Sequence, residues 1–107
     1  MNNDKALMSL CLARKAGRLV CGTGPCMESV RYGRAKLVII ACDVSAPTLK
    51  KITDKTAFHN VPAVCTEYSR SRLGAAFGCG ICACAAVTDD NFVRMFTQAN
   101  NKQAEEN

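Results

Sequence analysis

Cysteines are the residues of this chain whose spacing most resembles a chemical site. The chain has 8 cysteines among 107 residues, and three of them fall close together as Cys79, Cys82 and Cys84. Cys79 and Cys82 have the C-x-x-C spacing of many zinc sites, but a structural zinc ion takes four ligands, usually from two such pairs. The other cysteines are scattered singly, and the only histidine is His59. We therefore expect no metal site and no cofactor.

A redox role for the same segment is also disfavoured. A thioredoxin-like dithiol lies between a strand and the start of a helix, whereas here a loop leads into an apolar strand on which Cys82 and Cys84 share one face. No secretory leader is recognisable, so disulfides are not expected. We expect reduced, mostly buried thiols that pack as small apolar groups. The remaining cysteines are Cys11, Cys21, Cys26, Cys42 and Cys65.

A short glycine-rich segment, Gly22-Thr23-Gly24-Pro25, could contact a phosphate. The dinucleotide-binding pattern would need a third glycine where Met27 stands, and the Gly-Lys-Ser/Thr pattern is absent. What remains is a helix start whose free N–H groups can receive an anion. A tight turn into a helix explains the same residues, and both interpretations stay open.

Catalytic combinations are not recognisable in the chain. His59 is expected at a helix end, where an imidazole most often satisfies terminal carbonyls. The serines have no visible base partner, and the nucleophile-elbow pattern is absent. The candidate carboxylates are spread over element ends and read as caps: Asp43, Asp54, Asp89 and Asp90. We therefore predict that the protein is not an enzyme.

Positive charge is concentrated in the first third of the chain. The formal net charge is +5, and within residues 5–36 the only acidic residue is Glu28. The cations there are Lys5, Arg14, Lys15, Arg18, Arg31, Arg34 and Lys36. A basic region of this kind favours a polyanion such as nucleic acid, although a solvated surface explains it as well.

Hydrophobic periodicity places these residues on alternating strands and helices. The expected strands are 18–20, 36–42, 61–66 and 82–88, with 36–42 and 61–66 central in the sheet. Expected helices cover 4–15, begin at Gly24-Pro25 with proline at the first helical position, and begin again near 45, 69 and 89–90. The second is predicted to end at Gly33 and the fourth at Gly78, and residues from Ala99 onward are predicted to fray.

This order predicts an α/β fold in which helices cover both faces of a small sheet. We expect one domain over residues 1–98, followed by a polar tail over 99–107. No apolar run reaches the length of a membrane span, so a monomeric, cytoplasmic protein is expected. The predicted sheet core is Leu37, Val38, Ile39, Ile40, Val64 and Val87.

Several motifs in one register resemble a known family. They include Leu10-x-Leu-Ala-Arg-Lys-Ala-Gly-Arg18, Gly33-Arg34-Ala35-Lys36-Leu37-Val38, Leu73-Gly74-x-Ala76-x-Gly78 and Ala86-Val87-Thr88-Asp89. Their order over residues 6–97 resembles the bacterial YlxQ-type branch of the L-seven-Ae ribosomal protein superfamily. The resemblance implies a three-layer α/β/α sandwich with a small mixed sheet. It also implies RNA binding at kink-turns through the start of the second helix and a nearby loop.

The chain departs from that family where kink-turn readers carry Gly-x-Asn-Glu-x-x-Lys. Gly22 matches the glycine, but Gly24, Pro25 and Glu28 stand in place of Asn, Glu and Lys. The family's second contact loop falls on residues 77–81, where Cys79 replaces the usual basic character. The resemblance therefore carries RNA binding over to this chain more firmly than kink-turn specificity.

Three functions follow, of which RNA binding is preferred. The protein is expected to associate with the ribosome and its RNA, or to bind another structured RNA. The alternatives are a protein-interaction module on the same fold and, least favoured, a thiol or metal protein. The predicted RNA-binding residues are Arg14, Lys15, Arg18, Gly22, Thr23, Gly24, Pro25, Glu28, Arg31, Arg34, Lys36, Phe77, Gly78, Cys79 and Gly80.

Overall fold

Four short strands form one mixed sheet in the computed structural model, which describes residues 4–106, with side chains through residue 102. The strands are β1 (Leu19–Cys21), β2 (Leu37–Ile40), β3 (Ala63–Cys65) and β4 (Cys84–Val87). The helices are α1 (Lys5–Lys15), α2 (Thr23–Arg31), α3 (Ala46–Phe58), α4 (Arg70–Phe77) and α5 (Asp90–Glu106). The strand order is β1-β4-β2-β3, in which only β2 and β3 pair in parallel.

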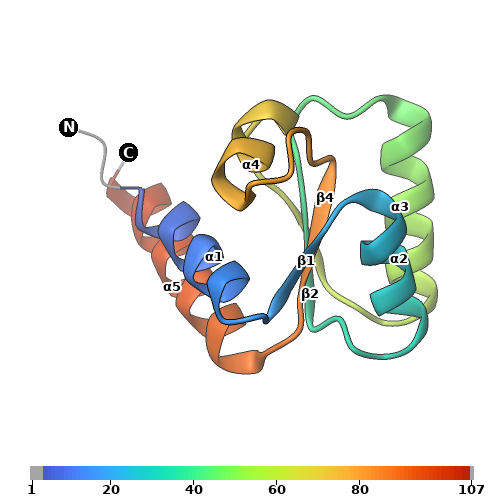
Figure 1. Cartoon of the computed structure of the whole chain (residues 1–107), viewed down its shortest axis with the longest axis horizontal. Coiled ribbons are helices and arrows are strands. Elements are labelled where there is room, and N and C mark those ends of the chain that lie inside the picture. The colour runs from blue at the N-terminus through green and yellow to red at the C-terminus, as the bar shows by residue number, and fades with distance from the viewer. Residues whose placement is uncertain (1–3, 107) are drawn as a thin grey trace.

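Helices cover both faces of this sheet (Figure 1), so the predicted three-layer sandwich is confirmed. Leu37 and Ile39 pack on the layer of α1, α4 and α5, while Val38 and Ile40 pack on the layer of α2 and α3. This alternation explains the unbroken apolar run along β2, because a strand buried on both faces has no polar side. The strand is thereby fixed at the centre of the molecule.

Side-chain caps set the helix starts where the sequence predicted them. Asp4 accepts a hydrogen bond from the Leu7 N–H at 3.1 Å, and Ser69 accepts one from the Arg72 N–H at 3.1 Å. Ser45 caps α3 in the same way. The predicted position of Pro25 is wrong: α2 begins at Thr23, so the proline is its third residue.

The prediction that residues 61–66 form a central strand is also wrong. β3 covers Ala63–Cys65 at the sheet edge, where Ala63 and Cys65 are exposed and Val64 is only half-buried. An apolar run shows that a strand has a buried face, but its neighbours in the sheet depend on contacts distant in sequence. The other predicted core residues of the sheet are buried.

The cysteines are less buried than the sequence suggested. Cys26, Cys82 and Cys84 are buried, whereas Cys42 and Cys65 are exposed. Cys82 precedes β4 and packs in the α1 layer, while Cys84 packs in the α2 layer, so the two do not share a strand face. At the C-terminus, α5 continues as a helix to Glu106, where a frayed end was expected.

Candidate nucleic-acid interface

The start of α2 presents main-chain N–H groups. Gly22 precedes the helix with φ +103°, a conformation that side-chain-bearing residues rarely adopt, and its N–H donates to the Cys84 carbonyl at 3.0 Å. Pro25 has no N–H, and the next donor, Cys26, bonds the Gly22 carbonyl at 2.9 Å. The Thr23 and Gly24 N–H groups therefore have no partner within the described residues, and a Cβ at Gly24 would meet open space.

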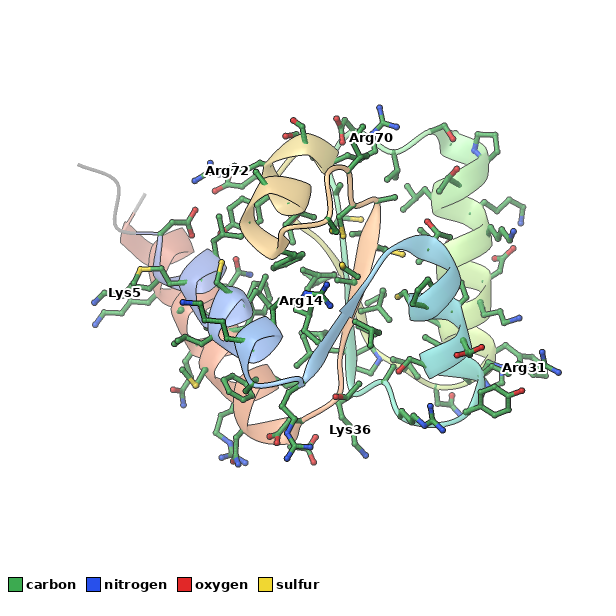
Figure 2. All side chains as sticks on the ribbon, viewed as in Figure 1. Lys5, Arg14, Arg31, Lys36, Arg70 and Arg72 are labelled. Carbon is green, nitrogen blue, oxygen red and sulfur yellow. The ribbon has the colours of Figure 1, made fainter. Side chains whose placement is uncertain are left out.

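The loop between α4 and β4 lies beside this helix start. A Cβ at Gly74 would come within 1.9 Å of the Gly80 carbonyl oxygen, so the loop rests directly on the backbone of α4. The Arg14 side chain, near the centre of Figure 2, donates to the Phe77 carbonyl at 3.3 Å and to the Leu19 carbonyl at 3.4 Å. These contacts join the end of α1, β1 and the loop. We call the set Arg14, Gly22–Gly24 and residues 77–81 the α2–loop surface.

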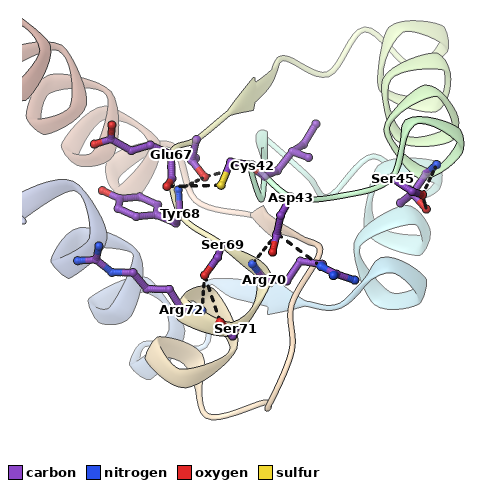
Figure 3. A network of polar contacts seen from close by, with 12 residues as sticks. Cys42, Asp43, Ser45, Glu67, Tyr68, Ser69, Arg70, Ser71 and Arg72 are labelled. Atoms are coloured by element: carbon purple, nitrogen blue, oxygen red, sulfur yellow. Dashed lines mark hydrogen bonds and ion pairs between the residues drawn. The ribbon is translucent and has the colours of Figure 1, made fainter.

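A polar network on the other side of α4 fixes the helix that carries this loop (Figure 3). The Asp43 carboxylate accepts from the Arg70 main-chain N–H at 2.8 Å and lies 3.5 Å from the Arg70 guanidinium. The Tyr68 hydroxyl donates to Asp4 at 2.6 Å, and Arg72 lies 3.3 Å from the same carboxylate. Asp43 therefore satisfies the first main-chain N–H of α4, next to the Ser69 cap, which agrees with its expected structural role at the end of an element.

Thiols form the inner lining of the α2–loop surface. Burial, with the hydrogen bond to the Cys79 thiol, raises the pKa of Cys21. Burial also raises the pKa of Cys82, and the hydrogen bond with Cys84 together with burial raises that of Cys26. These side chains are neutral near pH 7 and pack as apolar groups. In the described part of the chain, no cluster of three or more His, Cys, Asp or Glu residues could hold a metal ion.

A hollow with a volume of about 490 Å³ lies between β1 and α2. Its lining comes from the start of β1, α2, the turn into β2 and the end of β4, and includes Arg18, Pro25, Glu28, Arg34, Lys36 and Thr88. Figure 2 shows Lys36 below the sheet, on the side of the molecule away from Arg70 and Arg72 at α4. We call this hollow the basic cavity. The structure thus divides the predicted RNA-binding residues between two surfaces that share α2.

Three predicted residues contribute differently from expectation. Phe77 is only 4% exposed, so the loop presents its main chain and not this ring. Lys15 is exposed at the end of α1, and Arg31 lies over the Tyr32 ring instead of lining the cavity. Sequence reasoning missed the exposed Ile81 side chain, which is the apolar tip of the loop.

Two further residues were missed near the basic cavity. Ser29 lines it, and Tyr32 lies beside it, with Arg31 and Arg34 near its ring. For Tyr32 a signal existed, because an aromatic residue interleaved with cations is typical of nucleic-acid-binding surfaces. Ser29 carried no such signal.

Among the described residues, no helix combines the length and apolar character that crossing a membrane requires.

Comparisons with known proteins agree on one family. The model of the "Ribosomal protein L7Ae/L30e/S12e/Gadd45 family" matches residues 4–95. "RNA-binding protein YlxQ" of Bacillus subtilis (strain 168) is 40% identical over 81 residues, which cover 76% of this chain and 80% of that protein. The protein of the same name from Enterococcus faecium is 38% identical over 61 residues, covering 57% of this chain and 59% of that protein.

Solved structures show the same fold. A protein with unknown function from Bacillus halodurans C superimposes with a TM-score of 0.82 at 30% identity, covering 91% of this chain and 97% of that one. The Giardia lamblia 15.5kD RNA binding protein superimposes with a TM-score of 0.70 at 21% identity, covering 95% and 90%. The second likeness, at low identity, shows the shared fold alone.

Proposed function

The chain belongs to the ribosomal protein L7Ae/L30e/S12e/Gadd45 family, and from this membership and its YlxQ relatives we infer that it is an RNA-binding protein. We further propose that the RNA is structured and kink-turn-like, and that it lies on the α2–loop surface. The single observation that carries this proposal is the pair of unpartnered N–H groups of Thr23 and Gly24 beside the loop with the exposed Ile81.

The α2–loop surface suits a bent RNA backbone. Two N–H groups at a helix start bind a phosphate without reading a base. Gly24 leaves the approach open, and the apolar Ile81 side chain offers a contact for an unstacked base. Base-reading side chains are absent here, so affinity depends on shape at this surface and on cations elsewhere.

We further propose how the protein acts and which RNA it binds. The protein acts without catalysis, as a monomer in the cytoplasm, and its RNA is ribosomal RNA or another folded transcript. Crosslinking in cells, followed by sequencing of the bound RNA, identifies which. Recovery of ribosomal RNA fragments with a common bend supports the ribosomal assignment, whereas recovery of unrelated messenger fragments contradicts it.

A protein-interaction module on the same fold is the second candidate. Glu28, exposed on α2, would repel a phosphate, and the loop carries thiols instead of cations. Both features suit a protein partner better than RNA. The two candidates differ in whether RNA is bound at low salt.

The decisive experiment uses variants at Gly24, where an added side chain meets open space. Gly24→Asp places a carboxylate beside the free N–H groups, where it competes with an RNA phosphate and remains compatible with a helix start. Gly24→Ala adds only a methyl group and is the matched control. We expect Gly24→Asp to weaken binding to a kink-turn RNA more than to a straight duplex, and Gly24→Ala to change little. Absence of affinity for both RNAs at low salt would contradict RNA binding and favour the interaction module.

A further inference from the structure

The basic cavity concentrates charge from three separate segments. Arg18 precedes β1, while Arg34 and Lys36 belong to the turn that leads into β2. The one acidic residue among its described lining residues is Glu28, and Arg18 is shared with Asp89 through an ion pair at 3.7 Å. Positive charge therefore exceeds negative charge in a hollow large enough for a phosphate group and its neighbours.

Main-chain hydrogen bonds fix the backbone of the segments that carry these cations. The Arg34 N–H donates to the Ser29 carbonyl at 2.9 Å, and the Lys36 N–H donates to the Val87 carbonyl at 2.7 Å. The Arg18 carbonyl accepts from the Thr88 N–H at 2.9 Å. The backbone of each cationic residue is thus anchored to a neighbouring element, so the three side chains start from fixed positions around the same hollow.

Ser29 adds a hydroxyl that lacks a partner. It is only 5% exposed, it lines the cavity, and its buried Oγ atom makes no hydrogen bond within the described residues. A buried hydroxyl without a partner is unfavourable for the folded state, and a phosphate oxygen would satisfy it once the side chain turns toward the cavity.

Tyr32 provides a flat surface beside the cavity. Its side chain is 59% exposed, and the guanidinium carbons of Arg31 and Arg34 lie 5.5 and 5.9 Å from the ring centroid. Arg34 also lines the cavity, so one side chain joins the anion-binding hollow to the ring. Unpaired nucleobases stack on aromatic rings and on arginine planes in this way.

We propose that the basic cavity and Tyr32 together form a binding site for an unpaired nucleotide of RNA, with its phosphate at Ser29, Arg34 and Lys36 and its base on Tyr32. This site rests on the proposed RNA-binding function and is distinct from the α2–loop surface. The ligand is a single-stranded segment that flanks the structured RNA. Duplex RNA cannot offer the base, because its bases are paired and stacked within the helix.

The test compares two probes, an octaadenylate and a straight RNA duplex, across four variants. We expect Tyr32→Leu to weaken octaadenylate binding roughly tenfold, since stacking contributes strongly for each base, and to leave duplex binding unchanged. Tyr32→Phe restores affinity because the ring remains. Ser29→Ala lowers octaadenylate affinity while thermal stability is kept or raised. Lys51→Gln, which removes an exposed charge from α3, is the matched control and has no selective effect.

Tyrosine fluorescence gives a direct reading of the stacked base. The chain has no tryptophan and only two tyrosines, and the other one, Tyr68, is buried. Octaadenylate is therefore expected to quench the emission of the wild-type protein through Tyr32. In Tyr32→Phe the quenching disappears although the probe still binds.

The failure of this site differs from the failure of RNA binding itself. If the protein binds a kink-turn RNA, but wild type, Tyr32→Leu and Ser29→Ala have equal affinity for octaadenylate, only the nucleotide site is overturned. The nucleotide site is also overturned if polyglutamate competes as well as octaadenylate for binding to both wild type and Tyr32→Leu. The cavity would then select charge and not nucleotides. Loss of affinity for every RNA probe contradicts both proposals.

Discussion

The α2–loop surface and the basic cavity share α2 but offer an RNA different chemistry. The first has main-chain N–H groups, neutral thiols and the apolar Ile81, and its one cation, Arg14, bonds two main-chain carbonyls. The second has Arg18, Arg34 and Lys36 around a buried hydroxyl. Gly24 and Pro25 stand where the resemblance implies base-recognising side chains, and the cations of the basic cavity lie before β1 and after α2. Recognition of RNA shape and attraction of its charge therefore lie on separate surfaces, and each surface can be altered without changing the other.

The largest expected change comes from displacing the loop of the α2–loop surface. In Gly74→Ala the new methyl group would lie within 1.9 Å of the Gly80 carbonyl oxygen, so the loop must move away from α4. We expect the unfolding free energy to fall by about 1–3 kcal/mol, although alanine normally stabilises a helix interior. Thermal denaturation measures this. Gly24→Ala is the control, and equal melting temperatures for the two variants would show that the loop does not depend on this contact.

A smaller effect is expected at Glu28, which lines the basic cavity. Glu28→Lys replaces the acid of the basic cavity with a cation, which should improve RNA binding by about 1 kcal/mol, or roughly fivefold. We expect the gain to be larger for a kink-turn RNA than for a straight duplex. Titrations of both RNAs at two salt concentrations measure it. Glu67→Lys makes the same charge change at another exposed position, and an equal gain there would reduce the effect to net charge.

The smallest effect is expected from modifying thiols outside both surfaces. Cys42 and Cys65 are exposed and should react first with N-ethylmaleimide, whereas Cys26 and Cys82 are buried with raised pKa values and should react slowly. A time course followed by mass spectrometry gives the order. Protein alkylated only at Cys42 and Cys65 should keep its RNA affinity, and a marked loss would mean that RNA extends beyond the two surfaces.

Local signals in the sequence were sufficient for the elements and for most of their ends. Asp4, Ser45 and Ser69 cap helices because a cap depends on atoms within one turn of the chain. The order of strands depends on contacts far apart in sequence, which is why β3 was expected at the centre and lies at the edge. The opposite layers of Cys82 and Cys84 escaped prediction because the strand begins only at Cys84.

The sequence indicated the cations of the candidate site, but not Ile81 or Ser29, and not the division of the site into two surfaces. Positive charge near α2 could be read from the sequence, yet its distribution over two surfaces required the fold. The basic cavity takes its lining from segments as distant as Arg18 and Thr88, and Ser29 is significant only because its hydroxyl is buried without a partner. No linear pattern records such a group.

The salt dependence of RNA affinity tests most directly the claim that the basic cavity supplies the charge-dependent part of binding. The measurement compares wild type with a triple Gln variant at Arg18, Arg34 and Lys36, and with a control triple Gln variant at the exposed Lys5, Lys51 and Lys102. The slope of log affinity against log salt is negative, and each lost contact to a single-stranded phosphate should make it less steep by about 0.7. We predict a slope less steep by about 0.7 to 2 in the cavity variant, for one to three lost phosphate contacts, and an unchanged slope in the control. Equal slopes in all three proteins, or an equal loss of steepness in both variants, would contradict the account.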